Sequence, residues 1–215
     1  MFEIVKAGGW LMLPIIICSV VALAIIGERL WALQRKRVIP KHLVAQIWHW
    51  HNTGQLADDQ INSIRKGSPL GRVLASGLSN MKNNREVMKE SIEETGRHEI
   101  HEMERYLNTL GTVASISPLL GLLGTVIGMI KVFSVITTEG VGNPTVLSGG
   151  ISEALITTAA GLSVAIPSVM FYRYLRGRVE ELVVVMEQEA IKLVEVIHGD
   201  RDKPKPATVA KGNAK

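Results

Sequence analysis

One carboxylate stands out because it lies inside a segment that is otherwise apolar enough to cross a membrane. Residues 140–152 carry no charged side chain, Glu153 follows, and residues 154–172 are again free of charge. A bilayer core is spanned by ~20 predominantly apolar residues, and an ionised side chain at that depth costs ~2.5–3.5 kcal/mol on insertion scales. Such residues usually face a protein interior or a wet pathway. A proton pathway through Glu153 is therefore the leading functional hypothesis.

A carboxyl group in an apolar segment suits proton transfer for an ordinary physical reason. Desolvation disfavours the charged form of the group, so Glu153 can be neutral at rest and exchange a proton when water or a partner's charge arrives. Each proton moved across the membrane releases ~2.3 kcal/mol per 100 mV of potential. The alternative is a static carboxyl group that a neighbouring helix holds to fix assembly. The residues alone leave both interpretations open.

The residues around Glu153 divide into two faces when the segment is wound at 100° per residue. The face of the glutamate carries mostly small or polar residues: Gly149, Thr157, Ala160, Val164 and Pro167. The opposite face carries bulky aliphatic residues: Ile151, Leu155, Leu162, Ile166 and Val169. A similar face of small and polar residues precedes it in the chain: Ala114, Pro118, Gly121 and Thr125. Small residues let helices approach closely, and the threonine hydroxyls either bond to the preceding helical turn or serve a path.

Three long apolar segments position these residues. The chain has 215 residues, of which 47% are hydrophobic, and a mean hydropathy of +0.20. Charge-free runs occupy residues 10–27 and 106–130, and the Glu153 segment is the third. We therefore predict an all-α membrane protein with transmembrane helices over 10–34, 106–136 and 150–172.

The segments between the membrane helices also favour helix. Residues 35–105 form a predicted cytoplasmic helical region, with turn signals at Pro40, 52–54, 67–69 and 83–84. From residue 85 the apolar positions recur at helical intervals, so we expect one helix to run on into the second membrane segment, with Gly96 as a weak point. Apolar positions also recur every three or four residues after 172 and predict a cytoplasmic helix over 173–198. Helices two and three thus extend into a cytoplasmic helical bundle, and the polar tail 199–215 is expected to be disordered.

The distribution of charge predicts the orientation of the chain. The net charge of +4 and pI near 9.3 are explained by the positive-inside rule and need no nucleic acid partner. Basic residues crowd the exits of the first and third segments, at Arg35, Lys36, Arg37, Lys41, Arg173, Arg176 and Arg178. The loop 137–149 contains one Glu and no Lys or Arg. We expect the stub 1–9 and this loop to lie on the outer side of the membrane and the C-terminus to be cytoplasmic.

The first segment is expected to be a permanent anchor. The run Ala22-Leu23-Ala24 resembles a signal-peptide cleavage site. The strong basic cluster follows the apolar run, however, and the run continues past the possible cut.

The other reactive side chains give weaker signals. Cys18 lies inside the first segment, and this position favours a buried, inert thiol. His98 and His101 lack a third metal ligand, and snorkelling accounts for Lys131 near the outer end of segment two. With no nucleophile–base pair or metal-ligand set, we predict neither an enzyme nor a bound cofactor or metal.

Two stretches carry a family resemblance. The sequences SISPLLGLLGTVIGMI (115–130) and GISEALITTAAGLSVAIPSVMFYRY (150–174) resemble the MotA/TolQ/ExbB proton-channel family. The three-segment layout resembles the ExbB and TolQ branch, and the residues of the first stretch are more similar to ExbB. The family's functional glutamate matches Glu153, and its two threonines match Thr125 and Thr158. Thr157 stands where the family usually has Ala, so either neighbouring hydroxyl is a candidate for the path.

The resemblance implies a particular assembly and role. It implies an inner-membrane homopentamer whose second and third helices enclose a pore occupied by an ExbD-like partner with one membrane helix. Proton flow would then drive TonB-dependent transport across the outer membrane through a TonB-like transducer. A TolQ-like subunit of a cell-envelope maintenance system and a non-conducting membrane scaffold are the alternatives.

Overall fold

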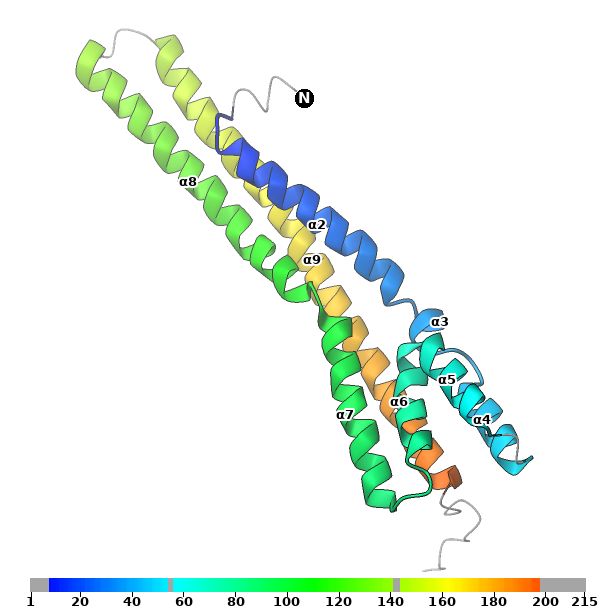
Figure 1. Ribbon diagram of the computed structural model, residues 1–215. Coiled ribbons are helices and arrows are strands. Elements are labelled where there is room, and N and C mark those ends of the chain that lie inside the picture. Colours follow the sequence, from blue (N-terminus) through cyan, green and yellow to red (C-terminus); the bar gives the residue numbers. More distant parts are fainter. Residues whose placement is uncertain (1–7, 54–55, 141–143, 198–215) are drawn as a thin grey trace, which may run out of the picture. The chain divides into compact units, whose positions relative to one another are not determined.

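The computed structural model describes residues 8–53, 56–140 and 144–197. In these ranges the chain consists of helices joined by short turns and has no strand (Figure 1). The chain divides into two compact units, the first made of residues 1–34 and 102–180 and the second of 35–101 and 181–215. The predicted tail 199–215 and most of the predicted stub 1–9 lie outside the described residues.

The first unit contains three apolar helices. They are α2 (Met12–Ala32), α8 (Leu107–Glu139) and the part of α9 (Pro144–Ile197) that ends at Glu180. They lie side by side in Figure 1, with α2 packed on α8 and α8 packed on α9. Each is long and apolar enough to cross a membrane. The three predicted membrane helices are therefore present, and the prediction of an all-α membrane protein is confirmed.

Small residues bring α8 and α9 into close contact, as the sequence predicted. A Cβ atom added to Gly124 would lie 2.1 Å from Thr157 Oγ1, and one added to Gly128 would lie 2.8 Å from the Cβ of Ala154. A Cβ on Gly161 would lie 2.5 Å from the carbonyl oxygen of Ser117. The aliphatic side chains predicted for the opposite face of α9 are exposed: Ile151, Leu155, Leu162, Ile166 and Val169. Close packing thus occurs along one face of α9, and lipid-compatible side chains cover the other.

The predicted continuous helix from residue 85 into the membrane segment is wrong in one detail. Two residues, Arg105 and Tyr106, separate helix α7 (Arg85–Glu104) from α8, and Tyr106 has a left-handed φ of 64°. The carbonyl groups at the end of a helix need new donors. Arg29 of α2 supplies them, because its Nη1 donates to the carbonyl oxygens of Glu102 and Met103 at 3.0 and 3.2 Å. The suspected weak point, Gly96, lies inside α7.

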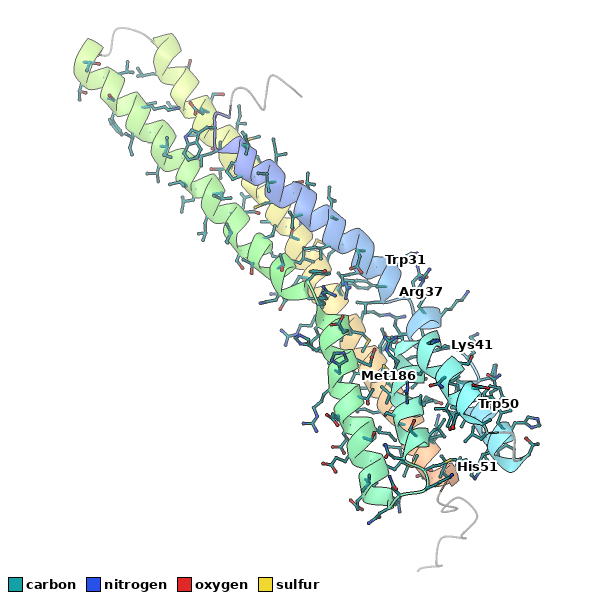
Figure 2. All side chains as sticks on the ribbon, in the orientation of Figure 1. Trp31, Arg37, Lys41, Trp50, His51 and Met186 are labelled. Carbon is teal, nitrogen blue, oxygen red and sulfur yellow. The ribbon has the colours of Figure 1, made fainter. Side chains whose placement is uncertain are left out.

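In the second unit, helices begin and end near the predicted turn signals. The helices are α3 (Arg35–Val38), α4 (Leu43–Asn52), α5 (Asp58–Gly67), α6 (Pro69–Ser79), most of α7, and α9 from Glu181. Ser68 caps α6 by accepting a hydrogen bond from the Gly71 N–H at 3.0 Å. The core is aliphatic, and Met186 of α9, labelled in Figure 2, is one of its buried side chains. Arg72 and the buried Glu99 add a two-armed ion pair with both N–O distances at 2.6 Å.

Candidate functional site

Glu153 is paired with a lysine of the neighbouring helix. Lys131 Nζ donates to both carboxylate oxygens of Glu153, at 2.8 and 3.0 Å. The Glu153 side chain is 22% exposed and the Lys131 side chain 51%. Lys131 is the one charged residue in 107–138, and Glu153 is the one charged residue in 144–172. Snorkelling was expected for Lys131, but its side chain forms an ion pair with Glu153 of the next apolar segment.

The interface between α8 and α9 places Lys131 opposite Glu153. Gly121, Gly124, Gly128 and Lys131 follow one another at intervals of three or four residues, which is one face of a helix. The three glycines of this face contact Thr158, Thr157 and Ala154 of α9 in turn. Lys131 occupies the next position of the face.

The backbone before α2 approaches the same carboxylate. Gly9 has a φ of 68°, and a Cβ atom added to it would lie 2.2 Å from Glu153 Oε1. Residues with a side chain rarely adopt that backbone conformation, so glycine suits position 9, and an added methyl group would displace the carboxylate. The carboxylate has the Gly9 backbone on one side and the Lys131 ammonium on another.

The three candidate threonines have different partners. Thr157 is 1% exposed, and its hydroxyl donates within α9 to the carbonyl oxygens of Ala154 at 2.9 Å and Glu153 at 3.1 Å. Thr125 donates in the same local manner to the carbonyl of Leu122 at 2.6 Å. Thr158 instead donates across the interface to the carbonyl of Gly121 at 2.9 Å. The structure thus places Thr157 one turn from Glu153 and uses Thr158 to join α8 to α9.

Hydroxyl groups that donate in this way keep an acceptor for other partners. A threonine hydroxyl has one donor hydrogen and two lone pairs. Thr125 and Thr158, which are partly exposed, can therefore each accept a hydrogen bond from water without giving up the bond that fixes them, whereas Thr157 is buried. That is the property required of a group beside a proton path.

Lys131 and Gly9 are the two residues of this site that sequence reasoning missed. The signal for Lys131 was available, because a single cation in segment two is the natural partner of a single anion in segment three. No local signal marked Gly9, since its role depends on a contact across ~140 residues of sequence, and glycine is common in such stretches.

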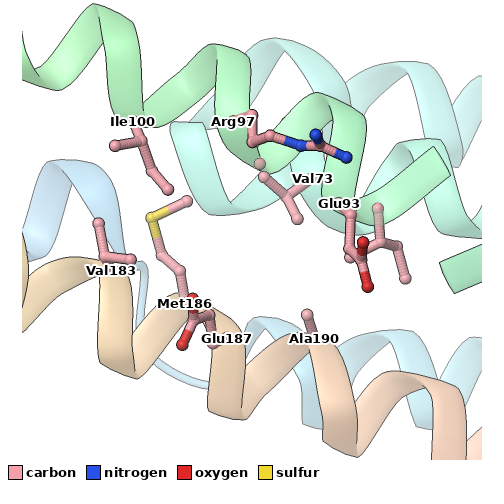
Figure 3. A pocket seen from close by; sticks show the side chains of 10 residues that line it. Val73, Glu93, Arg97, Ile100, Val183, Met186, Glu187 and Ala190 are labelled. Atoms are coloured by element: carbon pink, nitrogen blue, oxygen red, sulfur yellow. The ribbon is translucent and has the colours of Figure 1, made fainter. Parts of the chain in front are cut away.

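The second unit has a separate apolar cleft. It has a volume of about 260 Å³ and lies between α6, α7 and α9. Figure 3 shows Met186 of α9 reaching toward Ile100 of α7, with the charged Glu93, Arg97 and Glu187 also at the cleft. Its walls offer no nucleophile or metal-ligand set. Across the described ranges as a whole, no group of three His, Cys, Asp or Glu side chains is placed to hold a metal ion.

The fold and the site define a multi-pass helical membrane protein with a lone carboxylate in its third apolar helix. The profile of the MotA/TolQ/ExbB proton channel family matches residues 65–188. This range contains both stretches that carried the resemblance. The chain belongs to this family, which is one of transport proteins and proton channels.

Individual relatives indicate an ExbB-type member of the family. An ExbB-like biopolymer transport protein of Synechocystis sp. is 33% identical over 171 residues, which are 78% of this chain and 67% of that protein. The biopolymer transport protein exbB1 of Vibrio cholerae is 32% identical over 160 residues, covering 73% and 70% of the two chains. An ExbB homolog of Methanothermobacter thermautotrophicus is 30% identical over 114 residues, covering 53% and 40%. The predicted resemblance to ExbB is confirmed.

Proposed function

We propose that this protein is the proton-conducting subunit of an inner-membrane motor that couples the proton motive force to TonB-dependent transport across the outer membrane. The observation that carries the proposal is Glu153, a partly buried carboxylate alone in an apolar helix of a proton-channel family member. A charged group costs free energy in an apolar layer, and such a residue usually marks a functional path. A group that alternates between a carboxylate and a neutral carboxyl can pass a proton along a path through the apolar layer.

The threonines are proposed to line the path beside Glu153. Thr157 lies one turn away on the same helix, and Thr158 and Thr125 flank the packed face of α8 and α9. Their hydroxyls would accept hydrogen bonds from the water molecules that relay the proton. Thr158 would then chiefly fix α8 against α9, and Thr157 would lie beside the helical turn that contains Glu153.

Other copies and other proteins are part of the proposal. Large apolar side chains are exposed along α2, α8 and α9, which supports contacts with lipid and with further helices. We assign the assembly as a homopentamer with an ExbD-like single-helix partner and a TonB-like transducer. The basic residues after the first and third apolar segments support a periplasmic N-terminus and a cytoplasmic C-terminus.

One substitution separates proton transfer from structure. Glu153→Gln keeps the shape and the hydrogen bonding of the side chain but cannot be protonated and deprotonated. We expect this variant to insert, oligomerise and bind its partner, yet fail to support gradient-driven uptake in cells that lack their own copy of the gene. Glu153→Asp should retain partial uptake, because it keeps the carboxyl group one methylene shorter. The matched control is Glu180→Gln, which makes the same change on the same helix at an exposed side chain.

The scaffold hypothesis gives the opposite result. The ion pair with Lys131 is what a purely structural role for Glu153 would use. In that case Glu153→Gln would assemble poorly or would support full uptake once assembled, and full uptake would reject the proton role of Glu153. Thr125→Val and Thr158→Val should weaken uptake less than Glu153→Gln, since water can replace a hydroxyl along a path.

A further inference from the structure

Two lone charges of opposite sign meet in the apolar part of this protein. Lys131 is the one charged residue in 107–138, and its Nζ binds both oxygens of Glu153, the one charged residue in 144–172. Either charge alone would be costly in an apolar layer, whereas the pair has no net charge. The two-armed contact satisfies both carboxylate oxygens with one ammonium group.

The position of Lys131 is set by the packing of the helices. It follows Gly121, Gly124 and Gly128 on the face of α8 that contacts α9, and a Cβ atom added to Gly124 or Gly128 would lie 2.1 or 2.8 Å from an atom of α9. This close packing determines which residues of α8 and α9 lie opposite one another. A lysine two positions along α8 would lie on roughly the opposite side of the helix and would not reach Glu153. The register of the interface thus brings this ammonium to this carboxylate.

We propose that Lys131 is a positioning residue that holds the Glu153 carboxylate in place through both of its oxygens and releases it when a proton arrives. This inference rests on the proposed function of Glu153 as the proton carrier. A proton that binds the carboxylate gives a neutral carboxyl group. The attraction between the two side chains is then lost, and the lysine, already 51% exposed, turns away from α9. Departure of the proton restores the pair.

Because Glu153 is paired with Lys131, its protonation would change a contact between α8 and α9. Gly9 closes against Glu153 Oε1 from one side and Lys131 from another, so the carboxylate has little freedom while it is charged. Neutralisation removes the ion pair, while the close contacts of Gly128 with Ala154 and of Gly150 with Val132 remain. Each proton that passes would therefore loosen and then re-form one contact between the two helices.

The test measures the chemical state of Glu153 directly in inner-membrane vesicles that contain the full chain. Dicyclohexylcarbodiimide reacts with protonated carboxyl groups in apolar surroundings, and mass spectrometry of the peptide that contains residue 153 gives the initial rate of labelling. Lys131→Met removes the charge and keeps much of the side-chain volume. We expect it to raise the labelling rate about tenfold or more, because the carboxylate loses a charged hydrogen-bond donor that covers both of its oxygens, and to lower energised uptake.

Two further variants control for the loss of a lysine. Lys131→Arg keeps the positive charge and should leave the labelling rate and the uptake near those of the unmodified protein. Lys192→Met removes a lysine of similar exposure that is paired with Glu189 elsewhere on α9, and should change neither. Equal labelling of Glu153 in the Lys131→Met variant and the unmodified protein would overturn the proposal and leave Lys131 as a snorkelling side chain.

The outcome stays decisive if Lys131→Met fails to accumulate in the membrane. The double variant Lys131→Met with Glu153→Gln contains neither charge, so recovered accumulation would show that the unpaired Glu153 was the cause. No recovery would overturn the pairing. Failure of the proposed function has a separate signature, namely a fully active Glu153→Gln variant together with an intact labelling difference. Equal labelling with an inactive Glu153→Gln variant rejects the role of Lys131 alone.

Discussion

Gly124→Ala tests whether the close packing of α8 on α9 holds the site together. The added Cβ would lie 2.1 Å from Thr157 Oγ1 and 2.6 Å from Thr157 Cβ. Carbon atoms in contact lie ~3.5–4.0 Å apart, and the Cβ of Thr157 is fixed to its backbone, so a rotation of that side chain does not relieve the clash. The helices would have to separate by about 1 Å. Overpacking of this kind costs ~1–3 kcal/mol.

The control for this prediction is Gly27→Ala on α2. No atom lies within 4 Å of the Cβ that this change adds, and both variants gain ~0.5–1 kcal/mol from replacing a helical glycine. Gly124→Ala should therefore be about 1–3 kcal/mol less stable than Gly27→Ala. The assay is equilibrium unfolding of the purified protein by dodecyl sulfate in mixed micelles, followed by circular dichroism. Equal stability of the two variants would refute the description of this interface.

Two further predictions concern the contacts around the site and the break between α7 and α8. Gly9→Ala should lower energised uptake, whereas Gly140→Ala should not. Both glycines have a positive φ (68° and 71°), but of the two added Cβ atoms only the one at position 9 would lie within 4 Å of another side chain, that of Glu153. Equal uptake by the two variants would show that backbone strain alone matters. Arg29→Met should reduce the free energy of unfolding by about 2 kcal/mol or more, since two carbonyl groups lose a charged donor. Arg105→Met removes a more exposed arginine that, like Arg29, lies over the Tyr106 ring. It should cost less than about 1 kcal/mol, and a similar loss from both would contradict the capping role of Arg29.

Much of the fold followed from patterns with a direct physical meaning. The charge-free runs predicted three membrane helices, because length and hydropathy determine what a bilayer accepts. The apolar stripe after residue 172 predicted that helix to continue, and α9 does run to Ile197. Turn signals such as 67–69 gave helix ends, since Pro69 suits the first turn of a helix and Ser68 caps it.

The features that the sequence did not predict depend on contacts between distant residues. The break at Tyr106 needs Arg29, which lies 77 positions away and donates to the end of α7. Glu153 was identified from its surroundings in the sequence, but its partner Lys131 was interpreted on its own segment alone. Whether Lys131 lies opposite Glu153 depends on the register of α8 against α9. Glycine contacts set that register, and a helical wheel of one segment does not contain them.

If Glu153 carries protons, proton flux through the reconstituted complex depends on it. The full chain, purified together with the proteins that accompany it in mild detergent, is reconstituted into liposomes that contain a pH-sensitive dye, and a potassium diffusion potential is applied. We expect the unmodified complex and its Glu180→Gln variant to acidify the lumen above the rate of empty liposomes, whereas the Glu153→Gln complex, assembled to the same extent, should not. Equal flux through the unmodified and Glu153→Gln complexes would contradict the proton role of Glu153.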